Sequence, residues 1–164
     1  MSGISERRAP GRKIQRIGAY GVCVSVADQV LLSRLSPPDL RWVLPGGGVE
    51  HGEHPAAAVV REVLEETGYD VEVTRLLSVE SATWQAPDHA QVHAVSLLYE
   101  VELVGGELAS EAGGSSDLAA WFVLDDVPTL NRSDIVDVGL GRRSRPGADQ
   151  QGGEDPGALA AGRA

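Results

Sequence analysis

The sequence predicts an α+β, or mixed-sheet, layered domain. Two β-rich regions, at residues 16–44 and 71–104, alternate with two segments of helical pattern, at residues 55–67 and 126–140. Strands and helices in this order bury their apolar sides against one another in layers. The length of 164 residues and the apolar fraction of 42% fit one domain with a core of its own.

The first β-rich region is expected to form a hairpin followed by a short strand. Residues 16–27 are rich in Ile, Val and Tyr, and Asp28-Gln29 is a turn before a second apolar run at 30–35. A short strand at 41–44 then leads into a glycine-rich loop. The missing side chains of such a loop let its backbone approach a ligand closely.

A helix is predicted at residues 55–67. Pro55 stands at its first position, His54 precedes it, and Gly68 follows its last residue, in the pattern of helix start and stop signals. On a period of 3.6 residues, its apolar side collects Ala56, Val59, Val60, Val63 and Thr67.

The second half of the chain is expected to contribute strands and one more helix. Long apolar-rich strands are predicted at 71–84 and 92–104, with a polar loop between them. A shorter strand at 118–124 follows, and then a helix at 126–140 with Pro128 near its start.

A structured domain is predicted at residues 15–141, between two segments of different composition. Residues 1–14 are polar and basic and are expected to form a flexible arm. The alternative is that this arm lies over a partner subunit in a homodimer. Residues 142–164 are of low complexity and are expected to form a flexible tail.

The charge balance limits the classes of partner. A formal net charge of −10 argues against a protein that binds nucleic-acid polymers or membrane surfaces, because such proteins carry basic surfaces. It leaves phosphate substrates open, because bound cations invert the local charge. Cys23 is the single cysteine and is expected to be buried. No apolar run has the length of a transmembrane helix and no signal peptide is recognised, so a cytoplasmic location is expected.

Three glutamates gather on another side of the predicted helix, because positions three and four apart are neighbours: Glu62, Glu65 and Glu66. Like charges so close together weaken a helix unless a positive group lies among them. A hard divalent cation is such a group, since it prefers carboxylate oxygens and shares phosphate oxygens. Arg61, four residues before Glu65, is a second one. A solvated acidic face is the alternative.

The stretch from Gly47 to Tyr69 resembles the signature of the Nudix hydrolases, G-x5-E-x7-R-E-U-x-E-E-x-G-U, where U is a bulky apolar residue. The matching residues are Gly47, Glu53, Arg61, Glu62, Val63, Glu65, Glu66 and Gly68. Tyr69 departs from the pattern, since the family has an aliphatic residue there. The resemblance implies an α/β/α sandwich with a mixed sheet between helices. It also implies hydrolysis of a nucleoside diphosphate linked to another moiety, with Mg²⁺, or Mn²⁺ as a substitute.

The resemblance further implies roles for single residues. The implied metal ligands are a backbone carbonyl of Gly46 and the carboxylates of Glu62, Glu65 and Glu66. Glu53 and Arg61 are implied as the ion pair that orients helix and loop. The general base stays open between Glu62 and a downstream glutamate, either Glu107 or Glu111, each of which is alternatively a plain surface residue.

Candidate substrate-binding residues lie outside the helix. Gly47 and Gly48 belong to the glycine-rich loop. Trp84 leads into an open loop and Tyr99 lies in mid-strand, and either ring is a candidate to contact a base. Arg34 is a candidate phosphate contact, with an ordinary surface arginine as the alternative.

Three classes of function are compatible with these features. The first is a pyrophosphohydrolase, the second a regulatory protein that senses a small nucleotide without cleaving it, and the third an interaction module built on the acidic helix. The complete set of carboxylates favours the enzyme, because a sensor does not need every glutamate. One cysteine is too few for the zinc module of NADH pyrophosphatases, and the motif of coenzyme A pyrophosphatases is missing. ADP-ribose, nucleotide-sugar diphosphates and nucleoside triphosphates remain as substrate classes.

Overall fold

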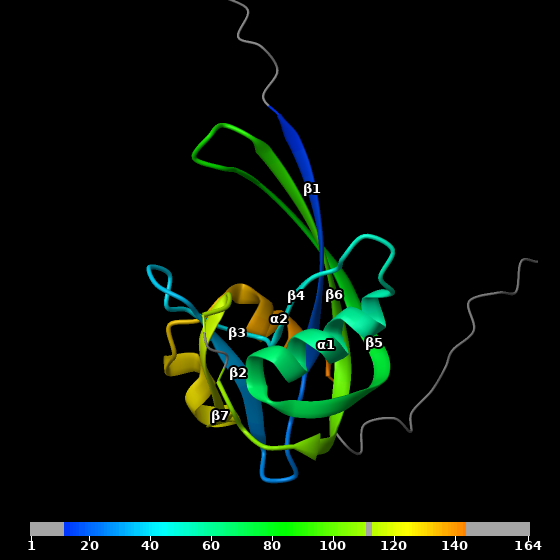
Figure 1. The fold of residues 1–164 in the computed structure, drawn as a ribbon. Coiled ribbons are helices and arrows are strands. Elements are labelled where there is room, and N and C mark those ends of the chain that lie inside the picture. The colour runs from blue at the N-terminus through cyan, green and yellow to red at the C-terminus, as the bar shows by residue number, and fades with distance from the viewer. Residues whose placement is uncertain (1–11, 111–112, 144–164) are drawn as a thin grey trace, which may run out of the picture.

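Two β-sheets lie between two α-helices in the computed structural model, which describes residues 12–110 and 113–143 (Figure 1). The four-stranded sheet has the strand order β4-β1-β6-β5, and the three-stranded sheet has the order β3-β2-β7. The strands are β1 (Lys13–Val22), β2 (Gln29–Leu35), β3 (Trp42–Val43), β4 (Gly46–Gly48), β5 (Tyr69–Gln85), β6 (Gln91–Gly106) and β7 (Ser116–Val123). The helices are α1 (Pro55–Thr67), the 3₁₀-helix η1 (Leu124–Thr129) and α2 (Asp134–Arg142).

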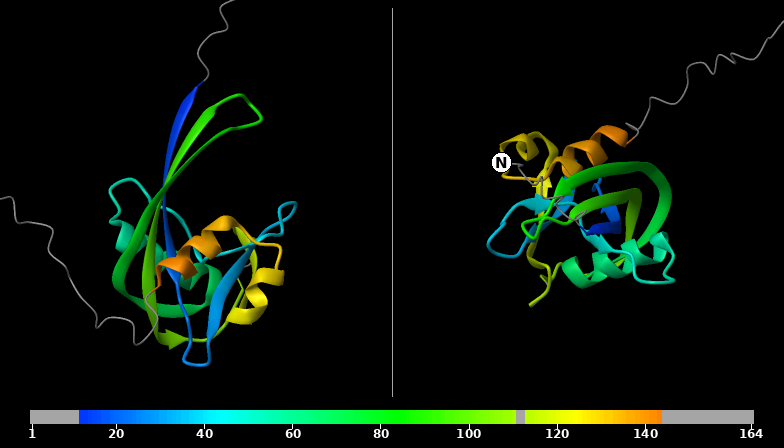
Figure 2. Two further views of the ribbon diagram at one scale, coloured as in Figure 1. Left: turned by 180° about the vertical axis from the view of Figure 1, so that it is seen from behind. Right: turned by 90° about the horizontal axis from the view of Figure 1, so that it is seen from above.

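The larger sheet is mixed, as predicted. Strand β1 pairs in parallel with β6, and antiparallel pairs join β1 to β4 and β5 to β6. Helix α1 packs on one face through Val59 and Val63, together with Ala19 of β1. Helix α2 packs on the other face through Val136, together with Val22 of β1. The two helices therefore cover opposite faces of the strands (Figure 2), which confirms the α+β fold.

Helix α1 begins and ends where its sequence signals predict. The Nδ1 atom of His54 accepts a hydrogen bond from the N–H of Ala56 at 3.2 Å, and Pro55 takes the first position, where no N–H is needed. Gly68 ends the helix in the left-handed conformation, with φ of 74°, and its N–H bonds the carbonyl of Leu64. The buried residues of α1 are Ala58, Val59, Val63, Glu66 and Thr67. Glu66 is thus on the buried side of α1, which excludes for this residue the alternative of a solvated acidic face.

The first β-rich region differs from the predicted hairpin. Strands β1 and β2 belong to different sheets, and only an isolated bridge between Val24 and Val30 joins the segments at their turn. The predicted glycine-rich loop is instead strand β4, in which Gly48 pairs with Gly18 of β1. Its glycines fit because β4 runs against α1 so closely that a side chain at Gly47 would overlap the Glu62 carboxyl group.

The predicted second helix is split into η1 and α2. Pro128 falls inside η1, and it has no N–H to continue an α-helix. Between the two helices, the N–H of Trp42 bonds the carbonyl of Asn131, and the N–H of Ser133 bonds the carbonyl of Trp42. This pairing with β3 holds the segment extended, so long-range pairing prevails over the helical pattern.

The predicted domain boundaries shift slightly. Strand β1 begins at Lys13, two residues inside the predicted arm, and α2 ends at Arg142, one residue past the predicted domain. The rest of the arm and of the tail lies outside the described residues. Cys23 is buried in the α1-side core, as predicted, and only 3% exposed. None of the described helices is long and apolar enough to span a membrane.

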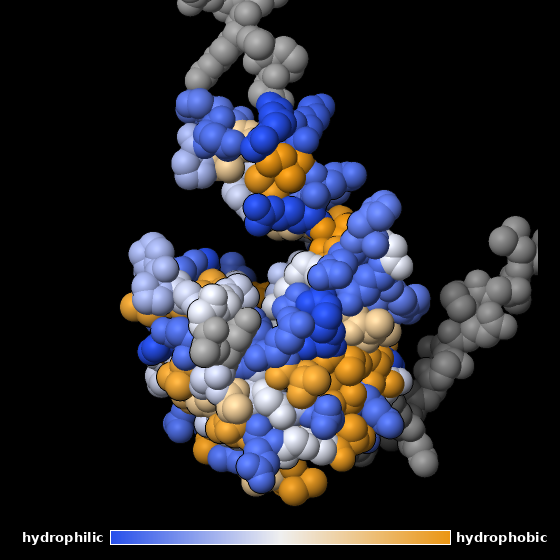
Figure 3. Space-filling view, viewed as in Figure 1, coloured by the Kyte–Doolittle hydropathy of each residue, from blue (hydrophilic) through white to orange (hydrophobic). Residues whose placement is uncertain are grey.

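Three strands extend beyond the body of the domain as a twisted projection, which we call the blade (Figure 1). It consists of residues 13–17 of β1, 81–85 of β5 and 91–95 of β6, which pair side by side. Figure 3 shows a notch between the blade and the body. Because side chains alternate along a strand, the blade continues both faces of the four-stranded sheet.

The C-terminal end of α1 gives a test of its packing. A Cβ atom at Gly68 would lie 2.4 Å from the carbonyl oxygen of Glu107, whereas a Cβ atom at Gly52, which has a similar φ of 83°, meets nothing within 4 Å. We expect Gly52→Ala to lower the free energy of unfolding by about 1–2 kcal/mol through backbone strain. Gly68→Ala adds the overlap to the same strain, so its loss is expected to be clearly larger in urea denaturation. Equal losses would contradict this close packing.

Candidate active site

Arg61 is the centre of the motif. Its guanidinium bonds both carboxylate oxygens of Glu53, at 2.9 and 3.0 Å, which confirms the predicted ion pair. The Nη1 atom donates to Glu62 at 2.9 Å and to Glu65 at 3.2 Å. The Nη2 atom also donates to the carbonyl of Gly48 at 3.1 Å. One side chain therefore joins helix α1, strand β4 and the loop between them.

The ion pair changes the acidity of Glu53. The hydrogen bonds from Arg61, followed by the N–H of Glu50, lower the pKa of the Glu53 carboxyl group to about 2 from its ordinary 4.5. Glu53 therefore stays ionised at any physiological pH. Its charge is used to hold Arg61, so it acts within the protein scaffold rather than as a proton carrier.

Strand β4 lies directly against the glutamates. A Cβ atom at Gly47 would be 2.6 Å from the carboxyl carbon of Glu62, so no other residue fits there without displacing that carboxylate. Gly46 gives its N–H to Glu66 at 3.1 Å. The glycines thus let the backbone reach the carboxylates, whereas the predicted approach of this backbone to a ligand stays a prediction. The ligand role of the Gly46 carbonyl stays a prediction.

Glu66 is held in a buried cage of hydrogen-bond donors. Its side chain is 2% exposed and accepts hydrogen bonds from Ser33 of β2 at 2.8 Å and from Ser116 of β7 at 2.5 Å. Ser115 contributes a longer contact at 3.4 Å. Burial raises the pKa of Glu66, with the nearby charge of Glu62 adding to it, while these donors act in the opposite direction. The cage fixes the carboxylate between α1 and both sheets.

The donor set suits a hard cation, although the carboxylates are arranged differently from the prediction. Among the described residues, no three His, Cys, Asp or Glu side chains converge as a preformed metal site. Glu62 and Glu65 both point to one nitrogen of Arg61, so a single positive group already lies between them. Glu66 lies behind them in its cage. Carboxylate oxygens are the ligands that hard cations such as Mg²⁺ and Mn²⁺ prefer.

The other candidate residues have mixed outcomes. Arg34 forms a two-pronged ion pair with Asp117, at 2.9 and 3.0 Å, and stacks over Trp42, so a phosphate would compete with this pair. Tyr99 is only 7% exposed in the core beneath α1, which corrects its predicted place at a ligand. Trp84 is 46% exposed on the blade.

Of the two downstream base candidates, only Glu107 belongs to the described residues. Glu107 follows β6 and is exposed where the chain passes the end of α1 at Gly68. Glu111 lies outside the described residues. The choice of general base therefore stays a prediction, with Glu62 next to Arg61 and β4 in the structure.

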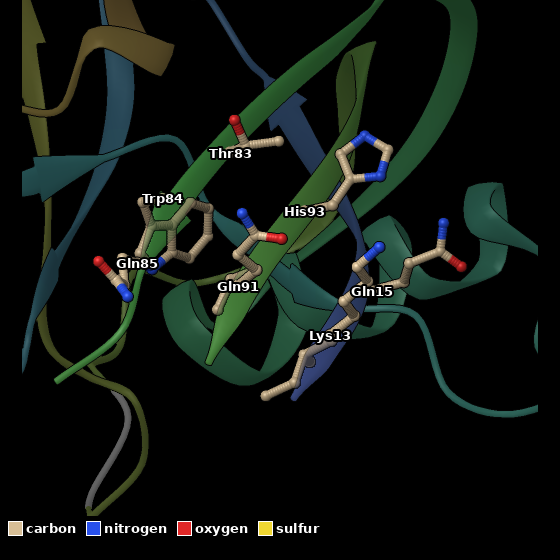
Figure 4. A pocket seen from close by; sticks show the side chains of 9 residues that line it. Lys13, Gln15, Thr83, Trp84, Gln85, Gln91 and His93 are labelled. Carbon is tan, nitrogen blue, oxygen red and sulfur yellow. The ribbon is translucent and has the colours of Figure 1, made fainter. Parts of the chain in front are cut away.

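An open pocket of about 790 Å³ surrounds the tip of the blade and contains none of the motif glutamates. Figure 4 shows the Trp84 ring on one side of the strands, and the Gln15 and His93 side chains on the other. This separation follows the alternation of the strands, in which Trp84 pairs with Val92 and Thr83 pairs with His93. The tip thus has an apolar side and a polar side.

Sequence reasoning missed the serine cage. Ser33 interrupts the apolar run of β2 and is fully buried. A small polar residue inside an apolar strand is the signal that could have indicated a buried hydrogen-bond partner. Ser116 had no comparable signal, because it lies in a stretch of Gly and Ser that favours a loop.

The Glu53–Arg61 pair predicts a dependence of stability on pH. A carboxyl group with a pKa of 4.5 when unfolded and about 2 when folded stabilises the native state above pH 4.5. This stabilisation is lost as the pH falls from 4.5 towards 2. In urea denaturation across this range, the free energy of unfolding of Glu53→Gln is expected to change less than that of the wild type. Glu72→Gln, at an exposed position of β5, serves as the control. Parallel curves for Glu53→Gln and the wild type would contradict the pair.

The serine cage predicts that Ser→Ala substitutions at different buried positions have different effects on stability. Ser33→Ala and Ser116→Ala each remove a donor from a buried carboxylate, so each is expected to lower the free energy of unfolding by about 1–3 kcal/mol. Ser78→Ala removes a buried hydroxyl group that has no hydrogen-bond partner among the described residues. That change is expected to leave stability unchanged or to raise it. Thermal and urea unfolding of all three variants measure the contrast, and equal losses would refute the cage.

Comparisons with known proteins agree with the motif found in the sequence. The family model described as NUDIX domain matches residues 15–138. An ADP-ribose pyrophosphatase of Methanocaldococcus jannaschii is 40% identical over 89 residues, which are 54% of this chain and 50% of that protein. Diphosphoinositol polyphosphate phosphohydrolase 3-alpha of Homo sapiens is 47% identical over 99 residues, 60% of this chain and 57% of that protein. The chain spans about half the length of the curated relatives it matches.

Solved structures share the fold over most of the chain. A Nudix hydrolase from Nitrosomonas europaea has a TM-score of 0.67 at 22% identity and covers 79% of this chain and 88% of its own. A MutT Nudix hydrolase from Burkholderia pseudomallei has a TM-score of 0.65 at 27% identity and covers 80% of this chain and 99% of its own. With the family match over residues 15–138 and the motif arranged around Arg61, these findings show that the chain belongs to the Nudix family.

Proposed function

We propose that the protein is a metal-dependent pyrophosphohydrolase that cleaves a nucleoside diphosphate linked to another moiety. The observation that carries this proposal is the pair formed by Glu62 and Glu65, whose carboxylates bond the same nitrogen of Arg61. Two carboxylates that share one cationic partner provide the oxygen ligands that a hard divalent cation requires. The membership of the Nudix family supports the same reaction.

Different residues of the chain would bind the metal ion, orient its ligands and position the helix. Glu62, Glu65 and Glu66 would hold Mg²⁺ or Mn²⁺, which when bound neutralises charge on the phosphate groups and lowers the pKa of a water molecule. The serine cage orients Glu66, and the Glu53–Arg61 pair keeps α1 in register with β4. Gly47 leaves open the backbone beside Glu62. Fixed charges of this kind stabilise charge that develops at phosphorus without rearranging during the reaction.

ADP-ribose is the first candidate substrate. Relatives named as ADP-ribose pyrophosphatase in Methanocaldococcus jannaschii, and as a putative one in Bacillus subtilis, support this choice. The human diphosphoinositol polyphosphate phosphohydrolase suggests a second substrate class. A formal net charge of −10 disfavours such densely charged anions, because a strongly basic surface is needed to attract them. A diphosphate with a neutral sugar or base at each end carries far less charge.

A substrate screen tests the proposal. Purified protein is mixed with ADP-ribose, nucleotide sugars, nucleoside triphosphates or a diphosphoinositol polyphosphate, with Mg²⁺, and phosphate is released from the products by an added phosphatase. Turnover of ADP-ribose that stops on chelation with EDTA and returns with Mg²⁺ or Mn²⁺ is the expected result. Binding of ADP-ribose without turnover of any compound would favour the sensor instead.

The carboxylate pair makes a sharper prediction. Glu65 is half-exposed on α1, so Glu65→Gln is expected to keep the fold while it removes one ligand charge. We expect kcat to fall by about 100-fold or more, on the scale of losing one electrostatic contact to the transition state. Glu72→Gln makes the same chemical change at an exposed position of β5 and is expected to keep kcat within about twofold. If Glu65→Gln behaves like Glu72→Gln, the ligand assignment fails.

A further inference from the structure

We propose that Arg16 and Tyr20 of β1 bind the phosphate groups of the substrate, beside the motif glutamates. This inference rests on the proposed function, because it places the diphosphate at the same centre. Neither residue belongs to the motif. Both lie on the face of β1 that continues from the α2-side core onto the blade, since even-numbered residues of this strand share one face.

Tyr20 reaches from this face towards the motif. Its ring folds back over Gly18, where a Cβ atom would lie 2.9 Å from Cε2 and 3.0 Å from the hydroxyl oxygen of Tyr20. The same Cβ atom would lie 3.2 Å from the carbonyl oxygen of Gly47. The phenol group therefore lies close to β4, at the edge of the glycine strand that contacts Glu62. Gly18 is required because a larger residue would displace the ring.

Tyr20 is close enough to the motif glutamates and to Arg16 for their charges to change its pKa. Burial raises the pKa of its hydroxyl group, and the negative charges of Glu66 and Glu62 raise it further, while Arg16 lowers it. The Tyr20 hydroxyl group therefore interacts electrostatically with the motif glutamates and with Arg16. A neutral hydroxyl group in this position can donate a hydrogen bond to a phosphate oxygen.

Arg16 is a basic residue on this face for which the described residues provide no ion-pair partner. Its side chain is exposed, and it forms no ion pair within the described part of the chain. By contrast, Arg12 pairs with Asp88, Arg34 pairs with Asp117, and Arg61 pairs with the motif glutamates. An exposed guanidinium close enough to act on Tyr20 suits a doubly charged phosphate linker, which it binds through several N–H groups.

The neighbours of Arg16 leave room for a ligand. Arg16 is in register with Ala94 of β6, which in turn pairs with Ala82 of β5. The next row on the same face is apolar and consists of Ile14, Val92 and the exposed Trp84. Trp84 lies two strands across and two residues along from Arg16, so their Cα atoms are about 12 Å apart, a span that a ligand with a phosphate at Arg16 and a base or sugar at Trp84 can bridge. The phosphate groups then reach back past Tyr20 to the glutamates.

Binding of a non-hydrolysable probe tests this arrangement. The affinity for α,β-methylene ADP-ribose in the presence of Mg²⁺ is measured by calorimetry at several salt concentrations, for the wild type and for Arg16→Gln, Arg16→Lys, Tyr20→Phe and Arg12→Gln. We expect Arg16→Gln to raise Kd tenfold or more and to weaken the salt dependence, because a charged contact is lost. Arg16→Lys is expected to recover part of the affinity, and Tyr20→Phe to raise Kd several-fold.

Arg12→Gln is the matched control, because it removes the same charge four residues along the same face of the chain. It is expected to bind as the wild type does. A Kd for Arg16→Gln within twofold of the wild type, or an equal loss in Arg12→Gln, would overturn the assignment. Steady-state kinetics give a second readout, in which Arg16→Gln raises KM for ADP-ribose more than it lowers kcat.

The outcomes separate this inference from the proposed function. If the wild type hydrolyses ADP-ribose and Arg16→Gln changes neither KM nor Kd, this inference fails alone. If the wild type binds the probe through Arg16 but cleaves no compound, the proposed function fails and the binding site stands. If the wild type neither binds the probe nor cleaves any compound, both are overturned.

Discussion

The site depends on the hydrogen bonds and ion pairs of the Arg61 guanidinium group. This group bonds Glu53 through Nε and Nη2, contacts Glu62 and Glu65 through Nη1, and also donates from Nη2 to the carbonyl of Gly48. Without this positive charge, three carboxylates within a few turns of helix and loop would repel one another. The arginine keeps them together at the surface of α1 and ties them to β4. Under the proposed function, the carboxylates that would bind the metal ion are thereby already held together by the positive charge of Arg61.

The buried carboxylate of Glu66 is a second constraint on the position of α1. Glu66 is buried against both sheets, and its serine partners come from β2 and β7 while its backbone partner comes from β4. A buried carboxylate is costly unless several donors surround it, so the cage fixes where α1 lies relative to the strands. The position of the helix, and with it the spacing of the exposed glutamates, follows from this polar contact as well as from the apolar core.

Much of the fold was predictable because local signals and periodicity agree. The bounds of α1 follow from His54, Pro55 and Gly68, which act within one turn of the helix. The long strands β5 and β6 follow from their apolar patterns. The predictions were wrong where contacts between residues distant in sequence determine the secondary structure and the strand pairing. The pairing of residues 131–133 with β3 divides the second helix, and the separation of β1 and β2 into two sheets replaces a hairpin.

The sequence by itself determined the motif, its ion pair and the ends of its helix, because these contacts join residues that are at most 13 positions apart, as Arg61 and Gly48 are. Only the tertiary structure decided which glutamate is buried. Helical spacing places Glu62, Glu65 and Glu66 together, yet the serines that hold Glu66 come 33 residues before it and 50 residues after it. Tertiary structure likewise brought Tyr20 beside the motif, since the pairing of β1 with β4 has no local signal in the chain.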